Sequence, residues 1–394
     1  MAKLIEITGK VLSGEWGTDD ESGNGIPVLR TTNFTNEGIV DYSNVVTRTI
    51  QKKNIDAKYL RKGDIIIEKS GGSNKQPVGR VIYFDGPEST YLFNNFTGLL
   101  RVKNQAVWLP RYVFYSLFHN YRKGGTRPFE SKTTGLHNLK TDDYISRYEV
   151  LEAPISEQQS ICKQLDYVYD IIKTRQQQLQ KLDELIKARF VELFGDPLLD
   201  DGRYCKAPLG CLAQVGSSKR IFEKEYVSEG IPFYRTKEIV ELSNGNKIST
   251  ELFITPKRYN EIRNEYGVPQ AGDLLISAVG TIGVIWIVDG KNDFYFKDGN
   301  LLRVANSDNF MPVYLKCLLE TLICAHKSKM SSGTAYAALT ISTLKEMSVY
   351  KVPLAEQSQF STFVSQVDKS KVAVQKSLDE AQLLFDSLMQ HYFG

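Results

Sequence analysis

Two long stretches of this sequence carry apolar residues at the seven-residue interval of a coiled-coil seam. In the first stretch, 154–195, the repeated apolar positions are Leu165, Ile172, Leu179, Ile186 and Leu193. In the second, 353–394, they are Val364, Leu378, Phe385 and Tyr392, and Lys371 interrupts the row. Neither stretch has an internal proline or glycine. Each is therefore predicted to form one long helix that packs against a partner helix.

The two stretches match each other in length and in register. Pro154 and Pro353 lie 199 residues apart, and so do Gly195 and Gly394, which indicates a duplicated chain. Ser156 with Gln159 predicts a capping box for the first helix, whereas the second has an alanine in place of the serine and is expected to fray more. At about 1.5 Å per residue, each helix would be about 60 Å long, and an antiparallel pair would act as a rigid spacer.

The segments outside the helices repeat one another in outline. A Gly-Ile-Pro strand motif begins at Gly25 and again at Gly230, and a Gly-Asp turn before an apolar run occurs at Gly63 and Gly272. Helical periodicity follows Pro110 and Pro312, and the alternating residues 3–11 predict a strand. We therefore predict an α+β protein with two mixed α/β domains in pseudo-twofold repeat, separated by a long antiparallel two-helix coiled coil. The predicted segments are 1–153, 154–196, 197–352 and 353–394.

Composition indicates a cytoplasmic protein. The hydrophobic content of 42% and charged content of 24% are ordinary for a soluble domain. We expect no signal peptide and no membrane span, because no apolar run approaches about 20 residues. The five cysteines lack CxxC spacing and are expected to be reduced thiols. A net charge of +3 is low for a protein that holds DNA alone, so positive charge is either gathered in patches or supplied by partners.

Catalytic motifs are not found in the sequence. There is no GxxxxGK[ST] loop, and the nearest match to an Asn-Pro-Pro-Tyr segment, at 94–96, lacks the prolines. Glu130-Ser-Lys132 resembles the end of a metal-dependent nuclease motif, but no aspartate lies between Asp85 and Asp142 to supply the upstream ligand. A solvated loop is the preferred interpretation of that segment. The histidines have no ligand spacing, so we predict neither catalytic residues nor a metal site.

The helix entries carry a resemblance to a known family. Pro-Ile-Ser-Glu-Gln-Gln begins the first helix and Pro-Leu-Ala-Glu-Gln-Ser the second, and the exit Phe-Val-Glu-Leu-Phe-Gly-Asp-Pro has a shortened copy at the C-terminus. With the Ile-Pro-x-x-Arg-Thr strands and the Gly-Asp turns, the chain resembles the specificity subunit of type I DNA restriction-modification systems over essentially its whole length.

This resemblance implies a function and a set of partners. The two globules would be target-recognition domains that each read one half of a split, asymmetric sequence in double-stranded DNA. The helices would set the spacer and dock adenine methyltransferase subunits, and a restriction and translocation subunit could join. The chain itself would be non-catalytic and hold no cofactor, with S-adenosylmethionine, ATP and Mg²⁺ expected only in partner subunits. Two globules on a rigid bar can meet one face of DNA about one helical turn apart.

Residues in polar, basic loops are the DNA-binding candidates, because loops on a scaffold carry most binding residues. Their lysines and arginines are candidates for contacts with phosphates, and their serine, asparagine and glutamine residues could read base edges. In the first globule the candidates are Arg30, Asn33, Lys69, Ser73, Asn74, Lys75, Gln76, Arg122, Lys123, Arg127 and Lys132. In the second they are Lys219, Arg220, Arg235, Lys237, Lys327 and Lys329. Arg30 and Arg235 occupy equivalent places in the repeat.

Two other functions are compatible with parts of the sequence. A coiled-coil scaffold with two protein-binding domains would use the same helices without DNA, and removal of the basic loops would then leave a partner's methylation intact. A nuclease in its own right would show metal-dependent cleavage by the isolated chain. The sequence does not give the recognised bases or the spacer length, nor does it show whether a restriction subunit exists.

Overall fold

The architecture comes from a computed structural model that describes residues 1–52, 55–74, 76–133, 136–199, 202–330 and 338–394. Contacts divide the chain into two compact units. Unit 1 comprises Met1–Gln176 and Lys376–Gly394, and unit 2 comprises Gln177–Gln375. Each unit therefore contains one globule and half of each long helix.

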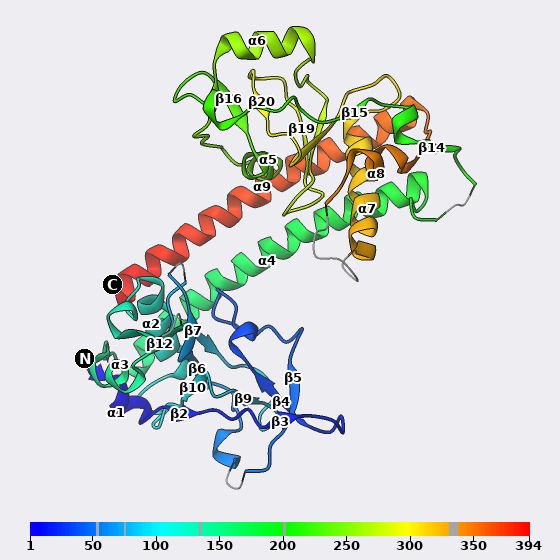
Figure 1. Ribbon diagram of the computed structural model, residues 1–394. Helices are drawn as coiled ribbons and strands as arrows, with labels where there is room; N and C mark the ends of the chain where they lie inside the picture. The colour runs from blue at the N-terminus through cyan, green and yellow to red at the C-terminus, as the bar shows by residue number, and fades with distance from the viewer. Residues whose placement is uncertain (53–54, 75, 134–135, 200–201, 331–337) are drawn as a thin grey trace. The chain divides into compact units, whose positions relative to one another are not determined.

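Unit 1 combines small sheets with short helices (Figure 1). Its strands are β1 (Ala2–Lys3), β2 (Leu12–Ser13), β3 (Thr18–Asp19), β4 (Ile26–Leu29), β5 (Val46–Thr49), β6 (Ile65–Glu68), β7 (Ser70–Gly72), β8 (Val81–Tyr83), β9 (Leu92–Phe93), β10 (Thr97–Leu100), β11 (Glu130–Thr133), β12 (Leu136–Leu139) and β13 (Glu149–Val150). Its helices are α1 (Leu4–Thr8), η1 (Thr31–Asn33), η2 (Asp56–Lys58), α2 (Pro110–Arg122), η3 (Arg127–Phe129), α3 (Thr141–Arg147) and the first half of α4 (Ile155–Phe194).

Unit 2 is built in a similar order. Its strands are β14 (Lys206–Pro208), β15 (Val215–Gly216), β16 (Ile231–Tyr234), β17 (Phe253–Ile254), β18 (Leu274–Ser277), β19 (Ile285–Ile287), β20 (Tyr295–Phe296), β21 (Leu301–Val304) and β22 (Ser348–Tyr350). Its helices are η4 (Leu209–Cys211), η5 (Glu223–Glu225), α5 (Thr236–Ser243), α6 (Pro256–Glu265), α7 (Pro312–Met330), α8 (Ile341–Glu346) and the first half of α9 (Leu354–Phe393).

The strand order confirms the predicted duplication. The central sheet runs β2-β10-β6-β8 in unit 1 and β15-β21-β18-β19 in unit 2. The Ile-Pro strand pairs in parallel with β9 in the first unit and with β20 in the second. The Gly-Asp turns lead into β6 and β18 as predicted, and their glycines have φ of +94° and +87°, where a side chain would be strained. The mixed fold class and the two long helices are likewise confirmed.

The aspartates of these two turns are buried structural anchors. Asp64 is 2% exposed and accepts hydrogen bonds from Arg101 through both carboxylate oxygens, each at 2.7 Å. Asp273 is 1% exposed and accepts a hydrogen bond of 2.6 Å from the Arg303 guanidinium. A buried carboxylate needs such charged and hydrogen-bonding partners, so the Gly-Asp motif has a packing role in both units.

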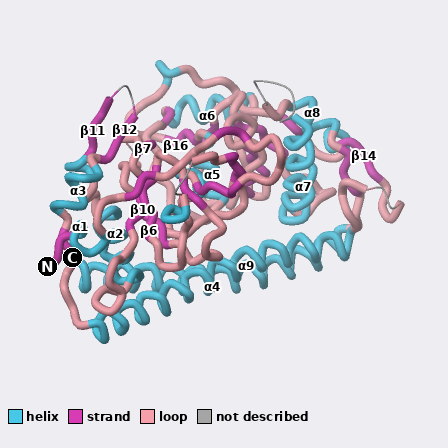
Figure 2. The backbone as a smooth tube through the Cα atoms, turned by 90° about the horizontal axis from the view of Figure 1, so that it is seen from below, coloured by secondary structure: helices cyan, strands magenta, loops and turns pink. Residues whose placement is uncertain are grey.

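The long helices pack antiparallel within each unit (Figures 1 and 2). In unit 1, Tyr392 donates a hydrogen bond to Gln164, and Arg175 donates one to Ser377. Residue numbers therefore increase along α4 while those of the facing residues decrease along α9. The seam residues Leu165, Ile172 and Phe385 are buried there, while Leu378 and Tyr392 pack against the same core. In unit 2, Ile186 and Val364 are buried and Leu193 is partly buried. Leu179 is half-buried.

Lys371 interrupts the apolar row with a charged contact. Its ammonium forms an ion pair with Asp183 of the facing helix, and it lies 3.8 Å from Asp368 on its own helix. Between Ile172 and Ile186 in α4, and between Val367 and Ala381 in α9, no side chain is buried. The middle of each helix is therefore more exposed than its two ends.

Two details of the sequence-based prediction are wrong. The alternating residues 3–11 contain the helix α1, because Leu4 and Ile7 face the core at helical spacing. The capping box of Ser156 and Gln159 does not form: the first turn already begins at Ile155, and both the Glu157 and Gln158 amides donate to the Pro154 carbonyl. The second helix starts in the same way after Pro353, so Ala355 gives no reason for extra fraying.

A buried glutamine explains the repeated Pro-x-x-Glu-Gln motif. Gln158 is 1% exposed, accepts from the Leu109 amide at 2.8 Å, and donates to the carbonyls of Val107 and Ala153, each at 2.9 Å. This side chain ties the start of α4 to the segment before α2.

The second copy repeats these three bonds. Gln357 is fully buried, accepts from the Met311 amide at 2.7 Å, and donates to Asn309 and Val352. The motif thus fixes each long helix to its own globule.

Candidate nucleic-acid interface

A polar hollow in unit 1 gathers several of the predicted DNA-binding side chains. It has a volume of about 530 Å³ and is lined by Asn36, Gln76, Pro77, Tyr121, Arg122, Lys123, Gly124 and Arg127. The lining comes from the loop after η1, the loop after β7, the C-terminal end of α2 and the loop after it. Residues up to about ninety positions apart in the sequence are thus brought to one place. A concave surface with three cations and two side-chain amides can bind a phosphate oxygen.

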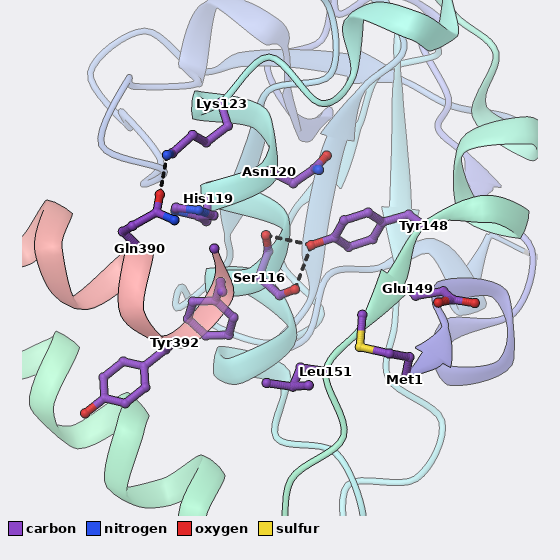
Figure 3. Close-up of a pocket in the computed structure, with 12 residues that line it drawn as sticks. Met1, Ser116, His119, Asn120, Lys123, Tyr148, Glu149, Leu151, Gln390 and Tyr392 are labelled. Atoms are coloured by element: carbon purple, nitrogen blue, oxygen red, sulfur yellow. Dashed lines mark hydrogen bonds between the residues drawn. The ribbon is translucent and has the colours of Figure 1, made fainter.

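The three cations of this hollow differ in the contacts that they make within the protein. Arg122 donates to Asp386 on α9 at 2.6 Å, and its guanidinium lies over the Phe118 ring. Lys123 donates to Gln390, also on α9, as Figure 3 shows. Arg127 is exposed, at the start of η3. Arg122 and Lys123 therefore hold the loop to the long helix, and Arg127 is the cation best placed to bind a ligand.

The loop after β7 lies beside a hairpin. β7 pairs with β12, and β12 pairs with β11, so Gly72, His137 and Lys132 form one row across three strands. Ser73 and Asn74 are exposed in the turn that follows β7, and Ser73 Oγ accepts from the Gln76 amide at 3.1 Å. Lys75 lies outside the described residues, as does the side chain of Lys132.

The segment that contains Glu130 is a strand, which corrects the expectation of a solvated loop. One oxygen of Glu130 accepts from the Val78 amide at 3.0 Å, and the other lies 3.2 Å from His137 Nδ1. Both side chains are about 10% exposed or less. Within the described residues, no group of histidine, cysteine, aspartate or glutamate side chains has the arrangement of a metal site.

Asn33, predicted as a DNA-binding residue, lies in the interior of unit 1. Its side chain is 1% exposed, accepts from the Arg30 amide at 2.9 Å and donates to the Asp41 carbonyl at 2.9 Å. Its amide group is occupied inside the protein and does not face base edges. Its polar loop sequence gave no sign of this burial.

The equivalence of Arg30 and Arg235 has a structural explanation. Each precedes a short helix, and the backbone amide of each donates to the side chain three residues later. The Arg30 guanidinium donates to the Asn44 carbonyl at 3.0 Å, and that of Arg235 pairs with the buried Glu238 at 2.9 Å. DNA contact by either residue stays a prediction.

Lys69 lies where two sheets of unit 1 meet. It follows β6, and its ammonium donates to Ser13 Oγ on β2 at 2.6 Å. Burial, reinforced by the nearby Lys58, lowers the pKa of Lys69 from its ordinary value. Its side chain is half-buried, so a DNA contact would involve only its end.

Unit 2 places two of its predicted cations on one loop. Lys219 lies with its ammonium 4.7 Å from the Tyr266 ring centre, and Arg220 pairs with Asp298 at 2.8 Å while 68% of its side chain stays exposed. Lys237 is exposed on α5. These residues present positive charge to solvent.

Lys327 and Lys329 were predicted in a loop but lie in the last turn of α7, where both are exposed. The helix continues past the expected end because its apolar periodicity extends to Ile323 and no glycine or proline intervenes before Met330. Cations in the last turn also favour the helix through its dipole. Their role at DNA stays a prediction.

A second hollow in unit 1 was not predicted. It has a volume of about 500 Å³ and is lined by Met1, Ser116, His119, Asn120, Lys123, Tyr148, Glu149, Leu151, Gln390, Tyr392, Phe393 and Gly394 (Figure 3). The Ser116 and Tyr148 hydroxyls lie 2.7 Å apart. Burial, reinforced by Lys123 and Arg122, lowers the pKa of His119. Its lining combines α2, β13 and α9, which no local sequence pattern could have joined.

Comparison with known proteins gives a consistent family. A model described as the type I restriction modification DNA specificity domain matches residues 2–184 and 206–381. A Haemophilus influenzae protein named as a type I restriction enzyme specificity subunit is 28% identical over 210 residues, which is 53% of this chain and 51% of that protein. The chain thus spans about half the length of that relative. A Methanocaldococcus jannaschii protein named as the type I restriction enzyme MjaX specificity subunit is 21% identical over 390 residues, 93% of this chain and 86% of the other.

Solved structures share the fold. The S subunit of a type I restriction-modification system from M. genitalium matches with a TM-score of 0.53 and 15% identity, over 100% of this chain and 95% of that one. A chain from a structure of type I R-M complex assembly and conformational transition matches with a TM-score of 0.54 and 16% identity, over 100% and 96%. Among the described residues, no helix combines the length and apolar character that crossing a membrane requires.

Proposed function

Because the chain belongs to the type I restriction modification DNA specificity family, we propose that it is the DNA-reading component of a restriction-modification complex. The observation that carries this proposal is the double match, in which one copy of the family model covers each globule and the larger part of its adjoining helix. Two copies with different loops would read two different half-sites.

The partners follow from the same proposal. The long helices would dock adenine methyltransferase subunits and set the number of base pairs between the half-sites. S-adenosylmethionine, and ATP with Mg²⁺ where a restriction subunit joins, would be bound by those partners. This chain would supply affinity and sequence choice without a catalytic residue of its own.

The direct test is a genome-wide map of methylated adenines in a host with and without this chain. We expect a two-part motif that is methylated only when the chain is present. A methylation pattern that does not change would contradict the proposal and favour the alternative of a coiled-coil scaffold without DNA recognition.

The unit 1 hollow gives a test at the level of one residue. Replacing Arg127 by alanine removes one exposed cation from the hollow, so binding should weaken to a similar degree for all sequences. The slope of log affinity against log salt should become shallower by about 1. Binding to labelled duplexes over a salt series measures both effects. Arg147→Ala, which removes an exposed arginine from the last turn of α3, is the matched control, and an Arg127→Ala slope equal to that of the wild type would exclude the contact.

A further inference from the structure

Phe96 is held on a rigid turn with half of its surface exposed. The turn joins β9 to β10, and Phe96 is 50% exposed. Its neighbours are fixed: Asn94 is 4% exposed, Thr97 is fully buried, and the Thr97 hydroxyl donates to the Asn94 carbonyl at 2.9 Å. The turn is therefore well ordered by buried hydrogen bonds, while its phenyl ring adds little to the core.

The same turn is joined to the strand that leads into the polar loop of unit 1. The Phe96 carbonyl accepts from the amides of Lys69 and Ser70, at 2.8 and 3.2 Å. Ser70 begins β7, which leads to the exposed Ser73 and Asn74. Backbone hydrogen bonds therefore link the Phe96 turn to Lys69 and to the strand that leads to Ser73 and Asn74.

Unit 2 has an exposed phenyl ring two residues away from a cation that pairs with the equivalent turn. The turn between β20 and β21 carries Gly299 and no aromatic residue. The neighbouring segment is fixed to it by Arg220, which pairs with Asp298, and by Ser217, which donates to the Leu301 carbonyl at 2.7 Å. Phe222 lies two residues after Arg220 and is 56% exposed.

We propose that Phe96 stacks against a base of the DNA half-site read by unit 1, with the Lys69 ammonium at a neighbouring phosphate; this rests on the proposed DNA-reading function. In a duplex each base face is covered by its neighbours, so the ring would stack where a base step is partly unstacked, and it would then cover the freed base face. Apolar side chains also enter base steps in proteins that distort DNA. Because the turn is already ordered, the ring loses little conformational freedom on binding. Phe222 is the corresponding ring in unit 2.

The test is selection from a random-sequence duplex pool. The tagged full-length chain is purified from its host with the subunits that accompany it, and the enriched sequences are compared between variants. For the wild type we expect a two-part motif. Phe96→Ala should lose sequence preference in one half and keep the other, with about 10-fold weaker binding to the wild-type motif. Phe96→Trp should keep both halves, since it retains a flat ring.

Val107, 50% exposed like Phe96 and outside the long helices, supplies the matched control in unit 1, and Val107→Ala should enrich the wild-type motif. If Phe96→Ala enriches the full motif at wild-type affinity, stacking by this ring is excluded. If both halves are lost although Phe96→Ala melts like the wild type, the ring serves partner attachment and the proposal is wrong. If Phe96→Ala does not fold, Phe96→Leu against Phe96→Trp decides it: equal motifs from both would exclude stacking. A wild-type chain that enriches no motif would instead overturn the proposed function, and this inference with it.

Discussion

At the scale of single residues, the two halves share a buried glutamine at the entry to each long helix. Gln158 satisfies one backbone amide and two carbonyls at the entry to α4. A backbone group that loses its partner in the interior keeps its desolvation cost without compensation. The glutamine is therefore expected to be needed for stability and not for ligand contact.

Replacement of Gln158 by leucine tests this role. It would leave the Leu109 amide and the carbonyls of Val107 and Ala153 without their side-chain partner, at a cost of about 1–3 kcal/mol. Urea unfolding followed by circular dichroism measures the loss. Gln159→Leu changes the adjacent exposed residue and should leave the midpoint unchanged. Equal midpoints for both variants would show that the buried amide is dispensable.

Two equivalent tyrosines offer a matched pair. Tyr112 donates to the Leu151 carbonyl at 3.1 Å, whereas the buried Tyr314 hydroxyl has no hydrogen-bond partner within the described part of the chain. Tyr112→Phe should thus lower the unfolding free energy by about 1 kcal/mol, and Tyr314→Phe should leave it unchanged or raise it. Thermal melts of both variants provide the comparison, and a clear loss with Tyr314→Phe would reveal a partner for that hydroxyl.

At the scale of elements, the long helices were predictable because forty residues with a heptad seam exclude a strand. The short α1 was not, since Ile5, Ile7 and Val11 fit alternation about as well as Leu4 and Ile7 fit helical spacing over so few positions. The capping prediction failed because a serine near a helix start looks like a cap, whereas the Pro154 carbonyl already accepts the first turn's bonds. Local patterns thus gave the elements but not their exact ends.

The charged interruption of the α9 seam makes a prediction at this scale. Lys371 occupies a seam position with only 26% of its side chain exposed, while Asp183 remains 58% exposed. Lys371→Met should therefore raise the unfolding free energy, by about 0.5–1 kcal/mol, because it removes a partly desolvated charge and strands no buried carboxylate. Calorimetry measures the shift, with the exposed Lys369→Met as control. A drop in melting temperature for Lys371→Met alone would mean that the ion pair stabilises the coil.

At the scale of the whole molecule, the sequence predicted the duplication, but its prediction of the site was less complete. Offsets near 200 residues reveal two copies whatever their loops contain. Candidate cations, by contrast, are chosen by loop position, and the sequence does not show that Arg122 reaches Asp386, 264 residues away. Nor does it separate the exposed Asn74 from the buried Asn33. Such distinctions depend on contacts that only the folded chain makes.

Each unit also has its own core, which predicts separable local stability. Phe360 is fully buried in unit 2, with its ring centre 5.4 Å from that of Phe190 and 5.6 Å from that of Phe194. Phe360→Ala should cost unit 2 about 3–5 kcal/mol. Because the middle of α4 and α9 buries no side chain, little of that loss should pass into unit 1. Native-state hydrogen exchange resolved by peptide should show protection falling in 202–304 and staying in 60–118. Phe114→Ala, in the buried α2 core of unit 1, is the reciprocal variant, and equal losses in both ranges for either variant would mean that the two units unfold as one.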